Sequence, residues 1–97
     1  MDLYSMVTAT PDQVSTYLEG QVVILNLKSG VYFGLSAVGA RIWELLEKPI
    51  EIRQIRDTIL AEYQIDGERC EKDVLAILEN MEQAGLIEIS HETHATA

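Results

Sequence analysis

The spacing of apolar residues changes once along this chain, near residue 36, and that change restricts the folds open to it. Before this point, short β-branched runs are separated by Glu19-Gly20 and Ser29-Gly30, pairs that favour tight turns between antiparallel strands. After it, apolar residues recur at intervals of three and four, as on one face of a helix. We therefore predict an α+β fold with winged-helix character, a three-stranded antiparallel sheet followed by three helices.

The predicted strands cover residues 13–18, 21–28 and 31–35. The alternation of side chains between the two faces of a strand indicates the length of the second turn. A slip of one residue in the strand pairing would move every side chain of a strand to the opposite face. A two-residue turn would place Leu27 opposite Tyr32. A three-residue turn with Gly30 in the left-handed region instead pairs Leu25 with Phe33, and leaves Val22, Ile24, Asn26, Tyr32 and Gly34 on the other face. We prefer this second register because it gathers six apolar residues on one face: Val23, Leu25, Leu27, Val31, Phe33 and Leu35.

The helical part divides at Pro49, which ends the first helix, and Ser36 is the predicted N-cap of that helix. The second helix covers residues 51–63 and the third covers residues 68–84. Gly85 suits the left-handed position after the third helix, with Leu86 folding back. The second helix carries an apolar stripe of Ile52, Ile55 and Ile59, and the third one of Cys70, Val74, Ile77, Leu78 and Met81.

A chain of 97 residues forms one domain. Little pattern marks residues 1–11, which we interpret as an N-terminal arm before a domain over residues 12–89. Residues 86–89 could add a short extended piece. Residues 90–97 are polar and small, and we interpret them as a disordered tail.

The net charge of −9 argues against two classes of partner. Nonspecific binding to nucleic acid needs cationic side chains that displace counterions, and docking on anionic membranes needs a basic surface. The N-terminus lacks a secretion signal, and no apolar stretch has the length of a membrane span. The single cysteine gives no sign of an oxidising compartment. We expect a cytoplasmic protein with neither a nucleic acid nor a membrane as its partner.

The residues give no sign of catalysis. Cys70 lies on the apolar stripe of the third helix, where a buried, inert thiol is expected. His91 and His94 fall in the tail, without an acidic ligand fixed beside them. The glycines do not form a phosphate loop. We therefore predict that the protein is not an enzyme and has no metal site, catalytic residue or cofactor.

Binding to DNA and binding to a peptide remain as alternatives. The third helix begins with Glu68 and continues with Glu79 and Glu82 on its exposed face, which phosphates would repel. The last strand of the sheet, residues 31–35, has no charge or proline to protect its edge. This edge either receives an added peptide strand or is covered by the N-terminal arm or by a second copy of the protein.

Two runs of residues, 30–35 (GVYFGL) and 39–46 (GARIWELL), resemble the PqqD-like family, as do Tyr63-Gln64-Ile65-Asp66, Asp73-Val74, Leu78 and Gly85-Leu86-Ile87. The resemblance covers roughly residues 12–89. It implies a small winged-helix-like recognition element that binds the leader segment of a ribosomally made precursor peptide. It also implies delivery of that peptide to maturation enzymes. With one domain, the chain is similar to the stand-alone members of the family, and the spellings Tyr-Phe-Gly-Leu and Arg-Ile-Trp favour those of lasso-peptide pathways.

The implied partners are the precursor leader peptide, a leader peptidase and a macrocycle-forming enzyme. The alternative enzyme partner is a radical SAM enzyme, as in pyrroloquinoline quinone assembly. The alternative roles for the chain itself are a winged-helix DNA-binding protein and a purely structural subunit of a larger enzyme. The oligomeric state is either a monomer or a strand-swapped dimer. In the family, the leader adds to the third strand and lies against the third helix. Carried onto this sequence, the implied peptide-binding residues are Val31, Tyr32, Phe33, Gly34, Leu35, Arg69, Lys72, Asp73, Val74, Ile77 and Met81.

Overall fold

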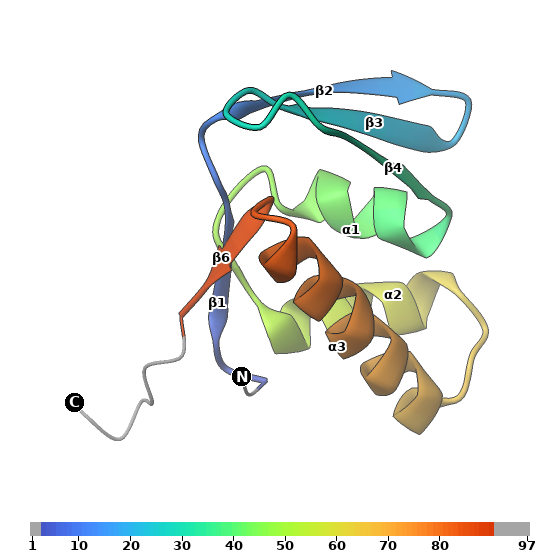
Figure 1. Ribbon diagram of the computed structural model, residues 1–97. Helices are drawn as coiled ribbons and strands as arrows, with labels where there is room; N and C mark the ends of the chain where they lie inside the picture. The colour runs from blue at the N-terminus through green and yellow to red at the C-terminus, as the bar shows by residue number, and fades with distance from the viewer. Residues whose placement is uncertain (1–2, 91–97) are drawn as a thin grey trace.

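The computed structural model describes residues 3–90, apart from the side chain of Ser36. Its first sheet consists of β2 (Gln13–Leu18), β3 (Gln21–Asn26) and β4 (Tyr32–Ser36), in the order β2-β3-β4 (Figure 1). Leu18 pairs with Gln21 across a two-residue turn, in which Glu19 has a φ of 45° and Gly20 a φ of 81°. Two left-handed residues match the twist of a hairpin, so the predicted first turn is confirmed.

The second turn is longer than predicted. Leu25 pairs with Tyr32 and Ile24 with Phe33, so the preferred register is wrong by one residue. The side-chain Oδ1 of Asn26 accepts hydrogen bonds from the backbone N–H groups of Lys28 at 2.9 Å and Ser29 at 3.2 Å. These bonds stabilise a four-residue loop over residues 27–30 that parity alone did not anticipate. Within it, Gly30 has a φ of 72°, in the expected left-handed region.

The shifted register changes which side of the sheet is buried. Val22 and Ile24 are fully buried, and Phe33 and Leu35 pack beside them. The predicted core face is therefore wrong for β3 and for the turn, where Leu27 is 58% exposed and Val31 is also exposed. It is right for Phe33 and Leu35 of β4. Side chains alternate strictly along a strand, so a difference of one residue in loop length reverses the faces of β4 relative to β3.

The three predicted helices are present as α1 (Val38–Leu45), α2 (Ile52–Glu62) and α3 (Gly67–Gln83). Ser36 is not the N-cap of α1: that position belongs to Ala37, which has a φ of 50° and makes no side-chain capping bond. Residue 36 instead ends β4, because the strand continues one residue further than predicted. Asp66 caps α3 by accepting a hydrogen bond from the backbone N–H of Arg69.

The apolar stripe of the second helix is buried as predicted, and so is that of the third helix except at Ile77. Ile52, Ile55 and Ile59 of α2 have no exposed area, and Ile77 of α3 is only partly buried. Gly85 has a φ of 79°, and the N–H of Leu86 donates to the carbonyl of Met81 at 3.0 Å. This bond closes the C-terminus of α3 in the expected way, and the α3 stripe is buried at Cys70, Val74, Leu78 and Met81.

A second sheet contains the segment interpreted as an arm. β1 (Met6–Ala9) lies at its centre, between β5 (Ile50–Glu51) and β6 (Ile87–Ile89). Val7 of β1 is fully buried, so this part of the N-terminal segment belongs to the core. The backbone N–H of Ser90 donates to the carbonyl of Met6 at 2.9 Å, and the rest of the predicted tail, 91–97, lies outside the described residues.

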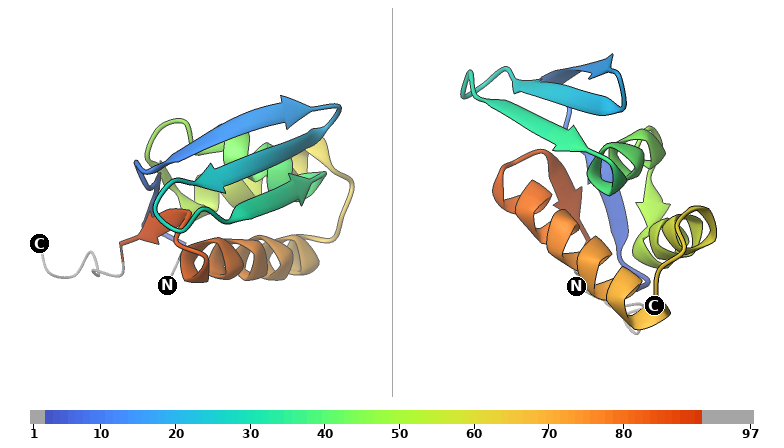
Figure 2. Two further views of the ribbon diagram at one scale, coloured as in Figure 1. Left: turned by 45° about the horizontal axis from the view of Figure 1, so that its top comes forward. Right: turned by 90° about the vertical axis from the view of Figure 1, so that its right-hand side faces the viewer.

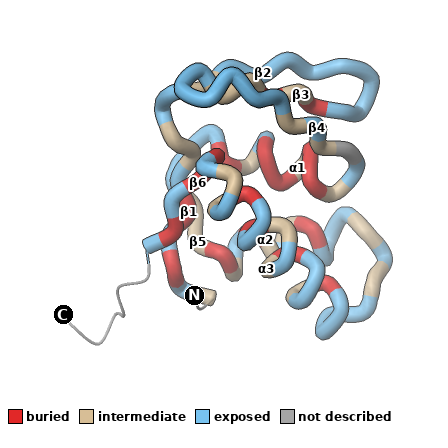
Figure 3. The backbone as a smooth tube through the Cα atoms, viewed as in Figure 1, coloured by how far each residue is buried: buried red, intermediate tan, exposed pale blue. Residues whose placement is uncertain are grey.

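The layers follow from these pairings. The β2-β3-β4 sheet lies over α1, with α2 and α3 on the far side of α1 and the second sheet at one end (Figure 1, Figure 2). Buried residues gather between these layers, while most of the outer surface of the first sheet is exposed (Figure 3). The predicted α+β fold, a three-stranded antiparallel sheet followed by three helices, is confirmed. None of the helices described in residues 3–90 is long and apolar enough to cross a membrane.

Candidate functional site

Strand β4 is an outer strand of its sheet, and its free edge runs alongside α3 (Figure 2). The N–H of Asn26 donates to the carbonyl of Val31 at 3.0 Å, which sets the alternation of hydrogen bonds along the β3–β4 pair. By this alternation, the backbone groups of Phe33 and Leu35 face β3. Those of Tyr32 and Gly34 face the open edge, where β1 does not cover them because it pairs within the other sheet.

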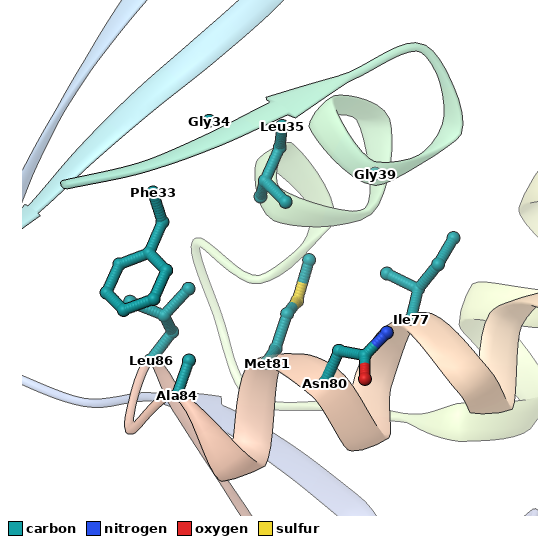
Figure 4. A pocket seen from close by; sticks show the side chains of 9 residues that line it. All are labelled: Phe33, Gly34, Leu35, Gly39, Ile77, Asn80, Met81, Ala84 and Leu86. Carbon is teal, nitrogen blue, oxygen red and sulfur yellow. The ribbon is translucent and has the colours of Figure 1, made fainter.

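A groove of about 310 Å³ separates this edge from α3 (Figure 4). Phe33 and Leu35 project from β4 into it, and Ile77 and Met81 face them from α3. The floor and ends are formed by the start of α1 and by the turn that follows α3. The complete lining is Phe33, Gly34, Leu35, Gly39, Ile77, Asn80, Met81, Ala84 and Leu86.

The structure brings together five of the residues expected to bind a peptide: Phe33, Gly34, Leu35, Ile77 and Met81. Four lining residues were missed by the sequence interpretation: Gly39, Asn80, Ala84 and Leu86. The helical spacing contained a signal for two of them. Asn80 and Ala84 follow Ile77 by three and seven residues, and such residues share one side of a helix.

A second cavity, of about 270 Å³, lies toward the N-terminal half of α3. Ile77 borders both spaces, and Asp73 and Val74 line the second one. Val74 is 1% exposed and Met81 is 2% exposed, so each serves mainly as a core residue with one surface on a cavity. The second cavity is lined by Val38, Ile59, Ile65, Cys70, Asp73, Val74, Ala76 and Ile77.

Four of the expected residues line neither cavity. Val31 lies in the turn segment, and Tyr32, 68% exposed, lies on the outer face of the sheet. Arg69 and Lys72 are exposed on α3 outside both linings. The Nε atom of Arg69 stands 3.8 Å from a carboxylate oxygen of Asp73 one turn later, so this cation is partly neutralised within its own helix.

Cys70 is fully buried at the base of the second cavity, and its Sγ donates to the carbonyl of Arg56 at 3.7 Å. Burial, and to a lesser extent the nearby charge of Asp73, raises the pKa of this thiol. A raised pKa disfavours the thiolate that nucleophilic chemistry requires. Among residues 3–90, no group of three or more His, Cys, Asp and Glu side chains could hold a metal ion. The arrangement suits an extended polypeptide, with backbone groups on one side and apolar hollows on the other.

Comparisons with known proteins identify one matching family and two similar solved structures. The family described as coenzyme PQQ synthesis protein D (PqqD) matches residues 21–87. The solved structure of TbiB1 in complex with the TbiA(beta) leader peptide is 40% identical, with a TM-score of 0.79, and the match covers 84% of this chain and 94% of that one.

A second structure, a lasso peptide synthetase B1 complexed with its leader peptide, shares the fold at 18% identity. Its TM-score is 0.70, over 84% of this chain and 96% of that one. No significant match is found among curated proteins. The match to the family sequence profile spans both the groove strand β4 and the groove helix α3, and the chain belongs to the PqqD family.

Proposed function

We propose that this protein is a non-catalytic adaptor that binds the leader segment of a ribosomally synthesised precursor peptide. The leader adds as a strand to β4 and places alternate side chains in the groove against α3. The observation that carries this proposal is the open, uncharged edge at Tyr32 and Gly34 beside a groove of about 310 Å³. Strand addition supplies affinity through backbone hydrogen bonds and selectivity through the side-chain hollows.

The mainly apolar lining of the groove supports a peptide with apolar anchors. Phe33, Ile77 and Met81 offer apolar surface, and burial of such surface stabilises a complex by roughly 25 cal/mol per Å² before ordering costs. A leader that is flexible in solution loses conformational entropy when it docks. We therefore expect moderate affinity, in the submicromolar to micromolar range.

The likeness to TbiB1 supports a leader as the occupant, because that protein was solved with the TbiA(beta) leader peptide. Because a lasso peptide synthetase B1 complexed with a leader peptide shares the fold as well, we propose that this protein acts in lasso-peptide biosynthesis. It would deliver the bound precursor to a leader peptidase and a macrocycle-forming enzyme. Delivery to a radical SAM enzyme is the alternative that the family name favours. A cytoplasmic location and a monomer or strand-swapped dimer complete the proposal.

The direct test is fluorescence anisotropy with a labelled leader from the cognate precursor peptide. A leader of scrambled sequence and a random DNA duplex serve as controls. We expect saturable binding of the authentic leader, with weak binding of the scrambled one and none of the duplex. Equal binding of authentic and scrambled leaders would contradict recognition through the groove. Salt-sensitive binding of the duplex would favour the DNA-binding alternative instead.

A further inference from the structure

The sheet has a second open edge, on the side away from β4. Strand β2 is the other outer strand of the β2-β3-β4 sheet, and a pocket of about 530 Å³ lies between it and α1. The pocket shares no lining residue with the groove beside α3. Its lining consists of Ala9, Ser15, Tyr17, Trp43, Glu44, Leu46 and Glu47.

The residues of β2 whose backbone groups face the open edge are also the ones whose side chains line this pocket. Leu18 and Gln21 flank a two-residue turn and therefore form a hydrogen-bonded pair, so Thr16 and Leu18 face β3. The backbone groups of Ser15 and Tyr17 consequently face the open edge, while their side chains line the pocket. Residues 13–18 contain neither a charge nor a proline, the usual protections of an exposed strand edge.

The charged side chains that line this pocket are all acidic. Glu44 and Glu47 line it, and the described lining includes no cationic side chain. Arg41 stands 3.9 Å from Glu44, but its guanidinium is engaged by Glu62 at 2.7 Å. Partial burial and the charges of Glu44 and Glu47 raise the pKa of Tyr17, as expected where the potential is negative.

We propose that the β2 edge is a second strand-addition site, whose occupant is an extended segment of a partner protein that carries lysine or arginine side chains. The segment hydrogen-bonds to the backbone of Ser15 and Tyr17. Its aliphatic stems lie on Trp43 and Leu46, and its cationic ends reach Glu44 and Glu47. This site is separate from the proposed leader site. A leader on β4 and a segment on β2 extend the same sheet from opposite edges. Both can be bound at once.

Trp43 is the single tryptophan of the chain, so its fluorescence reports on this pocket directly. The probe is a nine-residue peptide in which lysine alternates with valine, titrated against the intact protein, and a glutamate–valine peptide is its control. We expect a saturable change in Trp43 emission with the lysine peptide alone. The Glu44→Gln/Glu47→Gln variant should weaken binding about tenfold. The Glu68→Gln/Glu79→Gln variant, which removes the same charge from exposed positions on α3, should not.

The role of the edge is tested with Ser15→Pro, which removes an outward-facing N–H, against Ser15→Ala, which keeps it. We expect lysine-peptide binding to fall at least tenfold in the proline variant only, with leader binding as the check that both variants are folded. Three results would each overturn the proposal: no saturable response to the lysine peptide, equal loss from the α3 charge variant, or equal binding by the two Ser15 variants. Leader anisotropy is independent of all three, so failure of this site is distinguishable from failure of the leader site.

Discussion

The side-chain amide of Gln13 donates a hydrogen bond of 2.7 Å to the backbone carbonyl of Leu86, across 73 residues of chain. The same carbonyl accepts from the backbone N–H of Thr10 at 3.0 Å. These bonds join the segment that leads into β2 to the turn that follows α3. Because β4 belongs to the sheet that β2 begins, they also position one wall of the groove against the other.

Replacing Gln13 by alanine should therefore destabilise the fold. Removal of a partly buried hydrogen bond to a carbonyl typically costs about 1 kcal/mol. We expect urea unfolding to show a decrease of about this size in the free energy of unfolding. Gln64→Ala, at an exposed position in the α2–α3 connection, is the matched control and should change little. Equal stability of the two variants would contradict a joining role for Gln13.

Gly34 offers a direct test of strand addition. Its N–H faces the open edge, so Gly34→Pro removes a donor from the peptide site without removing one from the β3–β4 ladder. We expect leader affinity to fall at least tenfold by anisotropy. Gly34→Ala is the control, because a methyl group there would meet no atom within 4 Å. A folded Gly34→Pro protein that binds the leader normally would rule out addition at this edge.

Ile77 and Leu78 are neighbours on α3 with different surroundings. Ile77 is partly buried and borders both the groove and the second cavity, whereas Leu78 is fully buried in the core. We expect Ile77→Ala to weaken leader binding more than it lowers stability. Leu78→Ala should cost about 2–5 kcal/mol of unfolding free energy. Thermal unfolding and anisotropy on both variants separate the two effects, and the reverse pattern would show that the leader does not contact this part of α3.

The thiol of Cys70 should be inert. Burial raises its pKa, and its Sγ already donates to the carbonyl of Arg56. We expect slow alkylation of the native protein near neutral pH and rapid alkylation after unfolding, measured by mass spectrometry. Cys70→Ala should lower stability by about 1 kcal/mol through lost packing, with precursor processing by the partner enzymes unchanged. Loss of processing in a folded variant that still binds leader would indicate thiol chemistry.

The ion pair between Arg41 and Glu62 connects α1 to α2 and makes stability depend on pH. Arg41 donates two hydrogen bonds, of 2.8 and 2.7 Å, that lower the pKa of Glu62 below its ordinary value of 4.5. A carboxyl group with a lowered folded-state pKa stabilises the fold above its ordinary pKa. That contribution is lost as the pH falls through the lowered value. Native protein and Glu62→Gln should therefore differ in thermal midpoint at pH 7 and converge in acid. A difference independent of pH would exclude this pair as its source.

Local patterns in the sequence determined much of the architecture. The pair Glu19-Gly20 specified its turn because two adjacent left-handed residues are needed there. The spacing of Ile52, Ile55 and Ile59 specified a buried helix face, and Gly85 specified the end of α3. Five of the groove residues were predicted from the resemblance to a family. The resemblance locates them because members of one fold pack the same strand against the same helix.

Tertiary structure decided the features that depend on distant partners. The register of β4 depends on Asn26, whose side chain stabilises a loop one residue longer than hydrophobic parity suggested. β1 has no clear pattern of its own, and it is a strand because Ile50 and Ile89 supply neighbours on both sides of Val7. The groove and the β2 pocket are spaces between elements. They arise because hydrogen bonds such as Gln13 to Leu86 position those elements, and such bonds connect residues that are far apart in the chain.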